Sequence, residues 1–254
     1  MQAPKSYLID MDGVLLTGDR LIPGADAFIR RLQERGARYL VLTNNSMYSQ
    51  ADLQYRFRIA GLDIPAEHFY TAAMATAQFL ESQRPNSTVF VIGSAGLITA
   101  LHGAGFVLTD HSPDYFVLGD TITYSYEEIT RAIRLVRAGA RFIATSPDTS
   151  WTAEAGIAPA TGAVARLIEA ASGIHPYYIG KPNPLMMRTA LRYLDAHSEN
   201  SVMVGDRMDT DIIAGIESGL ETILVLSGVT RREQVDLFAY RPQRIVESVA
   251  EIGV

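Results

Sequence analysis

Short apolar runs alternate with amphipathic segments along almost the whole chain, and this alternation limits the possible folds more than any other feature of the sequence. The run YLIDM at 7–11 precedes a segment in which Phe28, Ile29 and Leu32 share one helical face, and Gly36 ends that segment. A second unit of the same kind starts with RYLVLTNN. Because strands joined by helices in this order form a largely parallel sheet, the pattern predicts an α/β fold.

The middle of the chain repeats this alternation and is long enough to form a sheet of its own. Strands are expected at TVFVIG, DYFVLGD and RFIATS. The first pattern resumes at YYIGKPNP, where Asn183 is the predicted N-cap of a helix and Pro184 its first residue. We therefore predict a core domain made of residues 1–80 and 178–254, with a smaller α/β domain, 81–177, inserted into it.

Polar side chains follow the predicted core strands at their carboxyl ends, where open parallel sheets bind their ligands. In chain order these residues are Asp10 with Asp12, Thr43 with Asn44, Lys181, and Asp206 with Asp211. Carboxylates that lie close together resist joint ionisation unless a cation or a proton neutralises them. The cluster therefore predicts a ligand site at this edge of the sheet.

The residue types at these strand ends suit phosphoryl transfer. Magnesium prefers oxygen ligands, and Asp10 with Asp206 can supply a pair of carboxylates. The ammonium group of Lys181 and the hydroxyl group of Thr43 can hold phosphate oxygens and stabilise the charge of a transition state. We therefore expect a Mg²⁺-dependent reaction at a phosphate group, in which Asp12 carries a proton for the leaving group.

The charge balance and the missing residue types narrow the classes of partner. The chain has 28 acidic and 22 basic residues, and its formal net charge of -6 argues against nucleic acid as a partner. It has no cysteine, which excludes disulfides and thiolate metal sites. The first residues, MQAPKSYLIDMDG, do not resemble a signal peptide, and no apolar segment approaches the ~20 residues that cross a bilayer. We expect a cytoplasmic protein without a membrane partner.

The motifs DMDGV, LTNN, GKP and GDRMDTD occur in the order found in the haloacid dehalogenase (HAD) superfamily, and the chain resembles phosphatases of that superfamily. The segments YTAAMATAQFL, GARFIATSPDT, YYIGKPNP and GLETILVLSGV are similar to its NagD-like branch, so the resemblance covers nearly the whole chain. It implies a Rossmann-like core with an inserted C2-type α/β cap domain. It also implies Mg²⁺-dependent hydrolysis of small phosphate monoesters through an aspartyl-phosphate. Nucleoside monophosphates are the expected substrates, with sugar phosphates, phosphoglycolate and p-nitrophenyl phosphate as alternatives.

The resemblance assigns roles to the residues of the first and last motifs. It implies that Asp10 is the nucleophile and that Asp12 is the general acid and then the general base for water. The Mg²⁺ ligands would be Asp10, the backbone carbonyl of Asp12, and Asp206. Gly13 would leave room for the backbone to approach the phosphate.

The resemblance also implies a phosphate-binding set from the second and third motifs. Thr43 and the amide of Asn44 would bind the phosphate, and Lys181 would neutralise it. Asp211 would support these groups from behind the metal ligands. Asp209 competes for that supporting role, and we expect Asp209 to be a helix N-cap and Asp211 the functional residue.

Two positions depart from the pattern of the NagD-like branch and bear on substrate specificity. Asn45 stands where a bulky aromatic residue is expected, so it either widens the site or adds a hydrogen bond. The loop SPDTSWTAEAG lacks the expected glycine- and aromatic-containing stretch and carries the only tryptophan, Trp151. That indole either stacks on a substrate or packs inside the cap or at a subunit contact.

Two other functional classes use similar residues. A receiver module that is phosphorylated on aspartate also has acidic residues, a hydroxyl and a lysine, but its phosphorylated aspartate follows a later strand than its metal-binding pair. Here Asp10 precedes Asp12 on the first strand, which disfavours that class. A non-catalytic phosphate-binding protein would lack one of the two, and both are present. The expected partner is a small phosphorylated metabolite, and the expected state is a monomer or homodimer.

Overall fold

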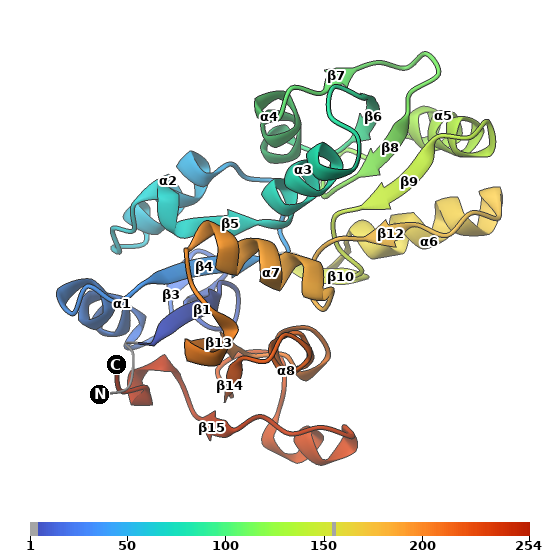
Figure 1. Ribbon diagram of the computed structural model, residues 1–254. Coiled ribbons are helices and arrows are strands. Elements are labelled where there is room, and N and C mark those ends of the chain that lie inside the picture. The colour runs from blue at the N-terminus through green and yellow to red at the C-terminus, as the bar shows by residue number, and fades with distance from the viewer. Residues whose placement is uncertain (1–4, 154–155) are drawn as a thin grey trace. The chain divides into compact units, whose positions relative to one another are not determined.

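The computed structural model describes residues 5–153 and 156–254, and its chain divides into two compact units (Figure 1). The first, called the core unit here, comprises Met1–Thr43, Ala51–Tyr70 and Lys181–Val254. The second, called the inserted unit, comprises Asn44–Gln50 and Thr71–Gly180. Compared with the predicted domains, this division moves residues 44–50, 71–80 and 178–180 to the inserted unit. Residues 71–80 belong to the inserted unit because helix α3 (Ala72–Gln83) packs against helix α4 (Ala95–Gly103) of that unit.

The core unit is built on a six-stranded sheet with the strand order β15-β14-β13-β1-β4-β5 (Figure 1). Its strands are β1 Ser6–Asp10, β4 Tyr39–Thr43, β5 Phe69–Thr71, β13 Ser201–Gly205, β14 Glu221–Val225 and β15 Arg244–Val246. Strand β1 lies between β4 and β13 and runs parallel to both. Every residue of these three strands is buried, as is typical of central parallel strands that are covered on both faces.

The helices of the core unit follow the predicted apolar pattern. They are α1 Ala25–Glu34, α2 Gln50–Ile59, α7 Pro184–Tyr193 and α8 Ile213–Glu217, and a turn of π-helix at Met208–Ile212 precedes α8. Short 3₁₀ turns lie at Ala66–His68, Ser198–Asn200, Arg232–Leu237 and Val249–Glu251. Strands β2 (Leu16–Thr17) and β3 (Arg20–Leu21) form a hairpin after β1. Asn183 caps α7, because its Oδ1 accepts a hydrogen bond from the N–H of Leu185 at 2.9 Å, and Pro184 is the first helical residue. Both predictions for this helix start are confirmed.

The inserted unit has its own five-stranded sheet with the order β12-β9-β8-β6-β7, and all of its pairs are parallel. Its strands are β6 Thr88–Ile92, β7 Val107–Leu108, β8 Tyr115–Leu118, β9 Arg141–Ala144 and β12 Tyr177–Tyr178. Helices α5 (Tyr126–Arg137) and α6 (Thr161–Ser172) share one apolar cluster with this sheet. Strands β10 (Ser150–Ala153) and β11 (Gly156–Pro159) form an antiparallel pair. The predicted α/β architecture, with a second and smaller sheet, is confirmed.

The segment 44–50 belongs to the inserted unit although it follows a core strand directly. The hydroxyl group of Ser46 donates to Oδ2 of Asp120 at 3.0 Å and accepts from the backbone N–H of Asp120 at 2.8 Å. Its backbone N–H also donates to Oδ2 of Asp120 at 3.2 Å, and the N–H of Gly96 donates to the carbonyl oxygen of Met47 at 2.9 Å. These bonds attach the segment to the carboxyl end of β8 and the start of α4.

None of the described helices combines the length and the apolar composition that crossing a bilayer requires.

Candidate active site

Asp10 ends the central strand of the core sheet and is 8% exposed. It pairs in register with Leu42 of β4, so Thr43, which is also buried, lies one residue further along the same sheet edge. The carboxyl end of β13 lies on the other side of β1 and leads into Asp206, which is 1% exposed. The topology therefore brings the predicted strand-end residues of three adjacent strands to one edge.

Lys181 connects two of the carboxylates of this site. Its Nζ donates to Oδ1 of Asp10 at 2.5 Å, to Oδ1 of Asp211 at 2.7 Å and to the carbonyl oxygen of Leu42 at 3.3 Å. Burial alone lowers the pKa of this ammonium group, but the negative charges of Asp10 and Asp211 outweigh it, and the net pKa is raised. Lys181 is therefore a permanently charged cation at the edge of the sheet.

The acidic side chains of the site outnumber this one cation. Burial raises the pKa of Asp10 well above its usual range; Lys181 opposes this effect, and Asp211 and Asp206 add to it. Burial and, next, the charge of Asp211 raise the pKa of Asp206 to about 7. Such shifts are expected where acidic side chains gather to bind a cation.

The donor set fits a divalent metal ion. Asp10, Asp206 and Asp211 each offer a carboxylate oxygen, and these oxygens lie within 4.8 Å of one another. Oδ1 of Asp206 is buried and has no hydrogen-bond partner in the described part of the chain. Both oxygens of Asp211 are already used, since Oδ1 accepts from Lys181 and Oδ2 accepts from the backbone N–H of Arg207 at 3.1 Å. Asp10 and Asp206 are therefore the better pair of oxygen ligands for Mg²⁺.

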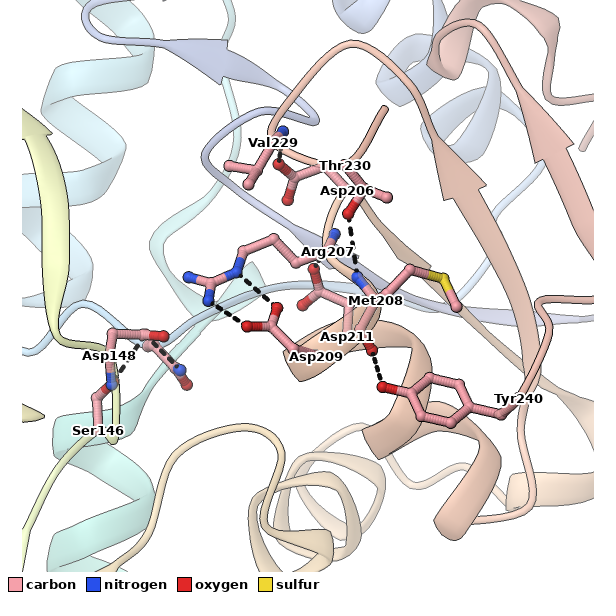
Figure 2. Close-up of polar contacts among 11 residues, drawn as sticks. Ser146, Asp148, Asp206, Arg207, Met208, Asp209, Asp211, Val229, Thr230 and Tyr240 are labelled. Atoms are coloured by element: carbon pink, nitrogen blue, oxygen red, sulfur yellow. Dashed lines mark hydrogen bonds and ion pairs between the residues drawn. The ribbon is translucent and has the colours of Figure 1, made fainter. Parts of the chain in front are cut away.

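Asp209 does not have the capping role that we expected for it. The π-helical turn at Met208–Ile212 begins after Arg207, and Asp209 is its second residue. The exposed carboxylate of Asp209 instead pairs with the guanidinium group of Arg207 through two contacts, at 3.0 and 2.8 Å (Figure 2). The prediction failed because a planar guanidinium beside a carboxylate forms a two-bond pair, and Asp211 already binds the N–H at the start of the turn.

Asp12 lies in the turn that follows β1. Its side chain keeps an exposed surface, yet enough protein surrounds it that desolvation raises its pKa, against the opposing charges of Arg56 and Lys181. Gly13, the next residue, has a φ of 80°, and a Cβ atom there would lie 2.4 Å from Oδ2 of Asp206. A carboxyl group with a raised pKa and access to solvent suits a group that gives and takes protons.

Three of the predicted site residues belong to the inserted unit. The side-chain Nδ2 of Asn44 donates to Oδ2 of Asp148 at 2.8 Å. The same oxygen also accepts from the hydroxyl group of Ser146 (Figure 2). Oδ1 of Asn45 accepts from the N–H of Met47 at 2.8 Å, which closes a local turn. Trp151 is 44% exposed on β10. The substrate-contacting roles of Asn44, Asn45 and Trp151 stay predictions.

One further segment of this edge, Ser227–Thr230, follows β14 and was not predicted from the sequence. Its Val229 N–H donates to Oδ2 of Asp206 at 2.7 Å. The strand-end rule, applied to ETILVLSGV as to the other strands, identifies this segment as well. Serine, glycine and valine carry no charge, so the side chains of this segment do not by themselves indicate a site.

Two family models match the chain, at residues 7–107 for the one described as haloacid dehalogenase-like hydrolase and at residues 178–252 for the one described as HAD-hydrolase-like. The chain is 52% identical to dihydroxyacetone phosphatase of Corynebacterium glutamicum over 98% of its own length and 90% of that protein. It is 45% identical to ribonucleotide monophosphatase NagD of Escherichia coli over 98% of both chains. The solved structure of NagD from E. coli matches with a TM-score of 0.94 at 43% identity and 99% coverage of both chains. That of p-nitrophenyl phosphatase from Archaeoglobus fulgidus matches with a TM-score of 0.91 at 34% identity and 98% coverage of both.

Proposed function

The chain belongs to the haloacid dehalogenase-like hydrolase family and is a phosphatase of small phosphate substrates, and we propose that the carboxylate of Asp10 is its nucleophile. One observation carries this proposal. Asp10 is a buried carboxylate at the end of the central strand, it is bound by the Lys181 ammonium, and it lies within 4.8 Å of two further acidic side chains. A nucleophile, a fixed positive charge and a cation site thus meet at one point.

The proposed reaction has two displacements at phosphorus. A carboxylate oxygen of Asp10 attacks, the bond to the ester oxygen breaks, and Asp12 gives its proton to the leaving alcohol or sugar hydroxyl. A water molecule then attacks the phosphorus of the aspartyl-phosphate, Asp12 takes its proton, and inorganic phosphate leaves with Asp10 restored. The raised pKa of Asp12 supports its role, because a carboxyl group must be protonated in the first step.

The remaining residues of the site bind the phosphate and the metal ion. Asp10, Asp206 and the backbone carbonyl of Asp12 would hold Mg²⁺, which when bound supplies positive charge beside the phosphate. The ammonium group of Lys181 and the hydroxyl group of Thr43 would bind phosphate oxygens. Asp211 accepts a hydrogen bond from the same ammonium group as Asp10 and would hold Lys181 in place.

The proposed substrates are small phosphorylated metabolites of two kinds. Nucleoside monophosphates remain the first candidate, supported by the 45% identity to ribonucleotide monophosphatase NagD. Dihydroxyacetone phosphate is the second, supported by the 52% identity to dihydroxyacetone phosphatase. Both are phosphate monoesters of an alcohol, so the same proton transfer from Asp12 serves either one.

Phosphate release from a panel of these esters, measured with Mg²⁺ and with EDTA, tests the proposal. Wild type is expected to release phosphate only with Mg²⁺, and Asp10→Asn is expected to lose activity by a factor on the order of 10³ or more while remaining folded. Asp63→Asn is the matched control, since Asp63 is an exposed carboxylate of the core unit. Substantial activity in Asp10→Asn rules out Asp10 as the nucleophile, and the ranking of the esters decides between the two substrate classes.

A further inference from the structure

The segment from Ser227 to Thr230 makes two backbone hydrogen bonds to Asp206, and Figure 2 shows the one from Val229. The N–H of Val229 donates to the side-chain Oδ2 at 2.7 Å, and the N–H of Thr230 donates to the backbone carbonyl oxygen at 3.1 Å. The segment therefore fixes both the side chain and the main chain of this predicted metal ligand. Oδ1 of the same carboxylate is buried and without a hydrogen-bond partner in the described part of the chain.

The segment is itself attached at both ends to the loops that carry the acidic residues. The hydroxyl group of Ser227 donates to the carbonyl oxygen of Gly13 at 2.7 Å. The hydroxyl oxygen of Thr230 accepts from the backbone N–H of Met208 at 3.2 Å. Thr230 is 6% exposed and Met208 is fully buried, so water cannot easily replace this second bond. The segment therefore joins the loop after β1 to the loop after β13.

Gly228 leaves the space in which the Asp206 carboxylate lies. A Cβ atom at position 228 would be 2.0 Å from Oδ2 of Asp206 and 2.5 Å from its Cγ. The backbone at Gly228 is not in the left-handed region, so the requirement for glycine at this position is one of space and not of conformation. Gly13 limits the same carboxylate from the other loop.

We propose that residues 227–230 are a positioning segment, which holds the Asp206 carboxylate in one orientation with Oδ2 on the Val229 N–H and Oδ1 left for a divalent cation. The inference rests on the proposed function and adds Gly228 and Thr230 to it as positioning residues. Groups that orient a metal ligand through a hydrogen bond typically change metal affinity by about 10- to 100-fold when they are removed. The segment thus sets how tightly the site binds its cation.

The test is Mn²⁺ binding to the full chain, followed by the electron paramagnetic resonance signal of free Mn²⁺. Gly228→Ala is expected to weaken binding by about 10-fold or more, because the added methyl group displaces the carboxylate. Gly253→Ala is the matched control: its Cβ atom meets nothing within 4 Å, its backbone is also outside the left-handed region, and it belongs to the same unit. The control is expected to bind Mn²⁺ as wild type does.

A second pair of variants covers the case in which Gly228→Ala does not fold. Thr230→Val keeps the shape of the side chain but removes the acceptor of the Met208 N–H, and it is expected to weaken Mn²⁺ binding about threefold or more. Thr230→Ser restores the hydroxyl group and should restore the affinity, which a purely structural packing role would not predict.

The outcomes separate this inference from the proposed function. Wild-type Mn²⁺ affinity in folded Gly228→Ala, or in Thr230→Val when Gly228→Ala does not fold, overturns the positioning role, and so does a wild type that binds no Mn²⁺. A wild type that binds Mn²⁺ but releases phosphate from no ester overturns the proposed function alone. In that case the comparison of affinities still decides whether residues 227–230 position Asp206.

Discussion

Lys181 is a fully buried ammonium group with three acceptors, Asp10, Asp211 and the carbonyl oxygen of Leu42. A buried charge is tolerated only when it is paired and hydrogen-bonded, so the lysine and the two carboxylates depend on one another. The arrangement also holds Asp10 at a fixed place on the sheet edge. The same side chain therefore serves the stability of the core unit and the geometry of the proposed nucleophile.

Lys181→Met is expected to lower the free energy of unfolding by about 3 to 5 kcal/mol, because it leaves two buried carboxylates without their cation. Urea unfolding monitored by circular dichroism measures this change. Lys5→Met is the matched control: its ion pair with Glu221 is partly exposed, so it should cost less than about 1 kcal/mol. Equal losses in the two variants would show that the buried network does not stabilise the fold.

The gathering of Asp10 and Asp206 followed from the sequence, because each comes after a buried strand and the parallel strands of the core sheet end at a common edge. Lys181 reaches this edge in another way, because the strand before it, β12, belongs to the sheet of the inserted unit and not to the core sheet as predicted. The division of roles between Asp209 and Asp211 was predicted only in part. The two residues are two positions apart in a π-helical turn, and a turn of this kind is not recognisable from periodicity. Which carboxylate faces Lys181 thus depends on a backbone geometry that the sequence pattern does not contain.

At the scale of elements, a single carboxylate joins the amino-terminal ends of strands β6 and β8. Asp114 accepts hydrogen bonds from the backbone N–H and the hydroxyl group of Thr88, at 2.9 and 3.0 Å, and it pairs with Arg84 at 2.6 Å. The backbone hydrogen bond from Thr88 is the largest of the causes that lower the pKa of Asp114 below its ordinary value of 3.8. These contacts of Asp114, called the Asp114 tether here, therefore need the ionised form of its side chain.

Asp114→Ala is expected to cost about 1 to 2 kcal/mol of unfolding free energy near neutral pH. Since the folded-state pKa lies below the unfolded value, the contribution is present above 3.8 and is lost as the pH falls through the lower, folded-state pKa. Unfolding in urea at a series of pH values should show wild type and variant converging in acid. A difference that stays constant with pH, or an equal loss in the exposed control Asp63→Ala, would contradict the tether.

Most helices and strands were predictable because their apolar residues repeat with the period of the element, as in α1, where Phe28, Ile29 and Leu32 are buried. The assignment of segment 44–50 to the inserted unit was not predictable, because it depends on hydrogen bonds to Asp120, a residue far along the chain. Local periodicity carries no information about such pairings.

At the scale of the whole molecule, the acidic site should link the stability of the protein to its metal ion. At a Mg²⁺ concentration of ten times the dissociation constant, binding adds about 1.4 kcal/mol. For a chain of this size that corresponds to a rise in Tm of roughly 3 to 6 °C. Thermal unfolding with Mg²⁺ and with EDTA measures the shift, which Asp206→Asn should abolish and Asp63→Asn should retain. An equal shift in Asp206→Asn would place the stabilising ion elsewhere.

The two pieces of the inserted unit have a consequence for protein engineering. A chimera that exchanges only the contiguous stretch 71–180 for that of a relative would separate Asp120 from Ser46 and Gly96 from Met47. The grafted part of the inserted unit would then face residues 44–50 of a different protein at the carboxyl end of β8, where the Asp120 side chain accepts two of these bonds. Exchanging the inserted unit between related proteins therefore calls for a graft in two pieces, with residues 44–50 moved together with the larger one.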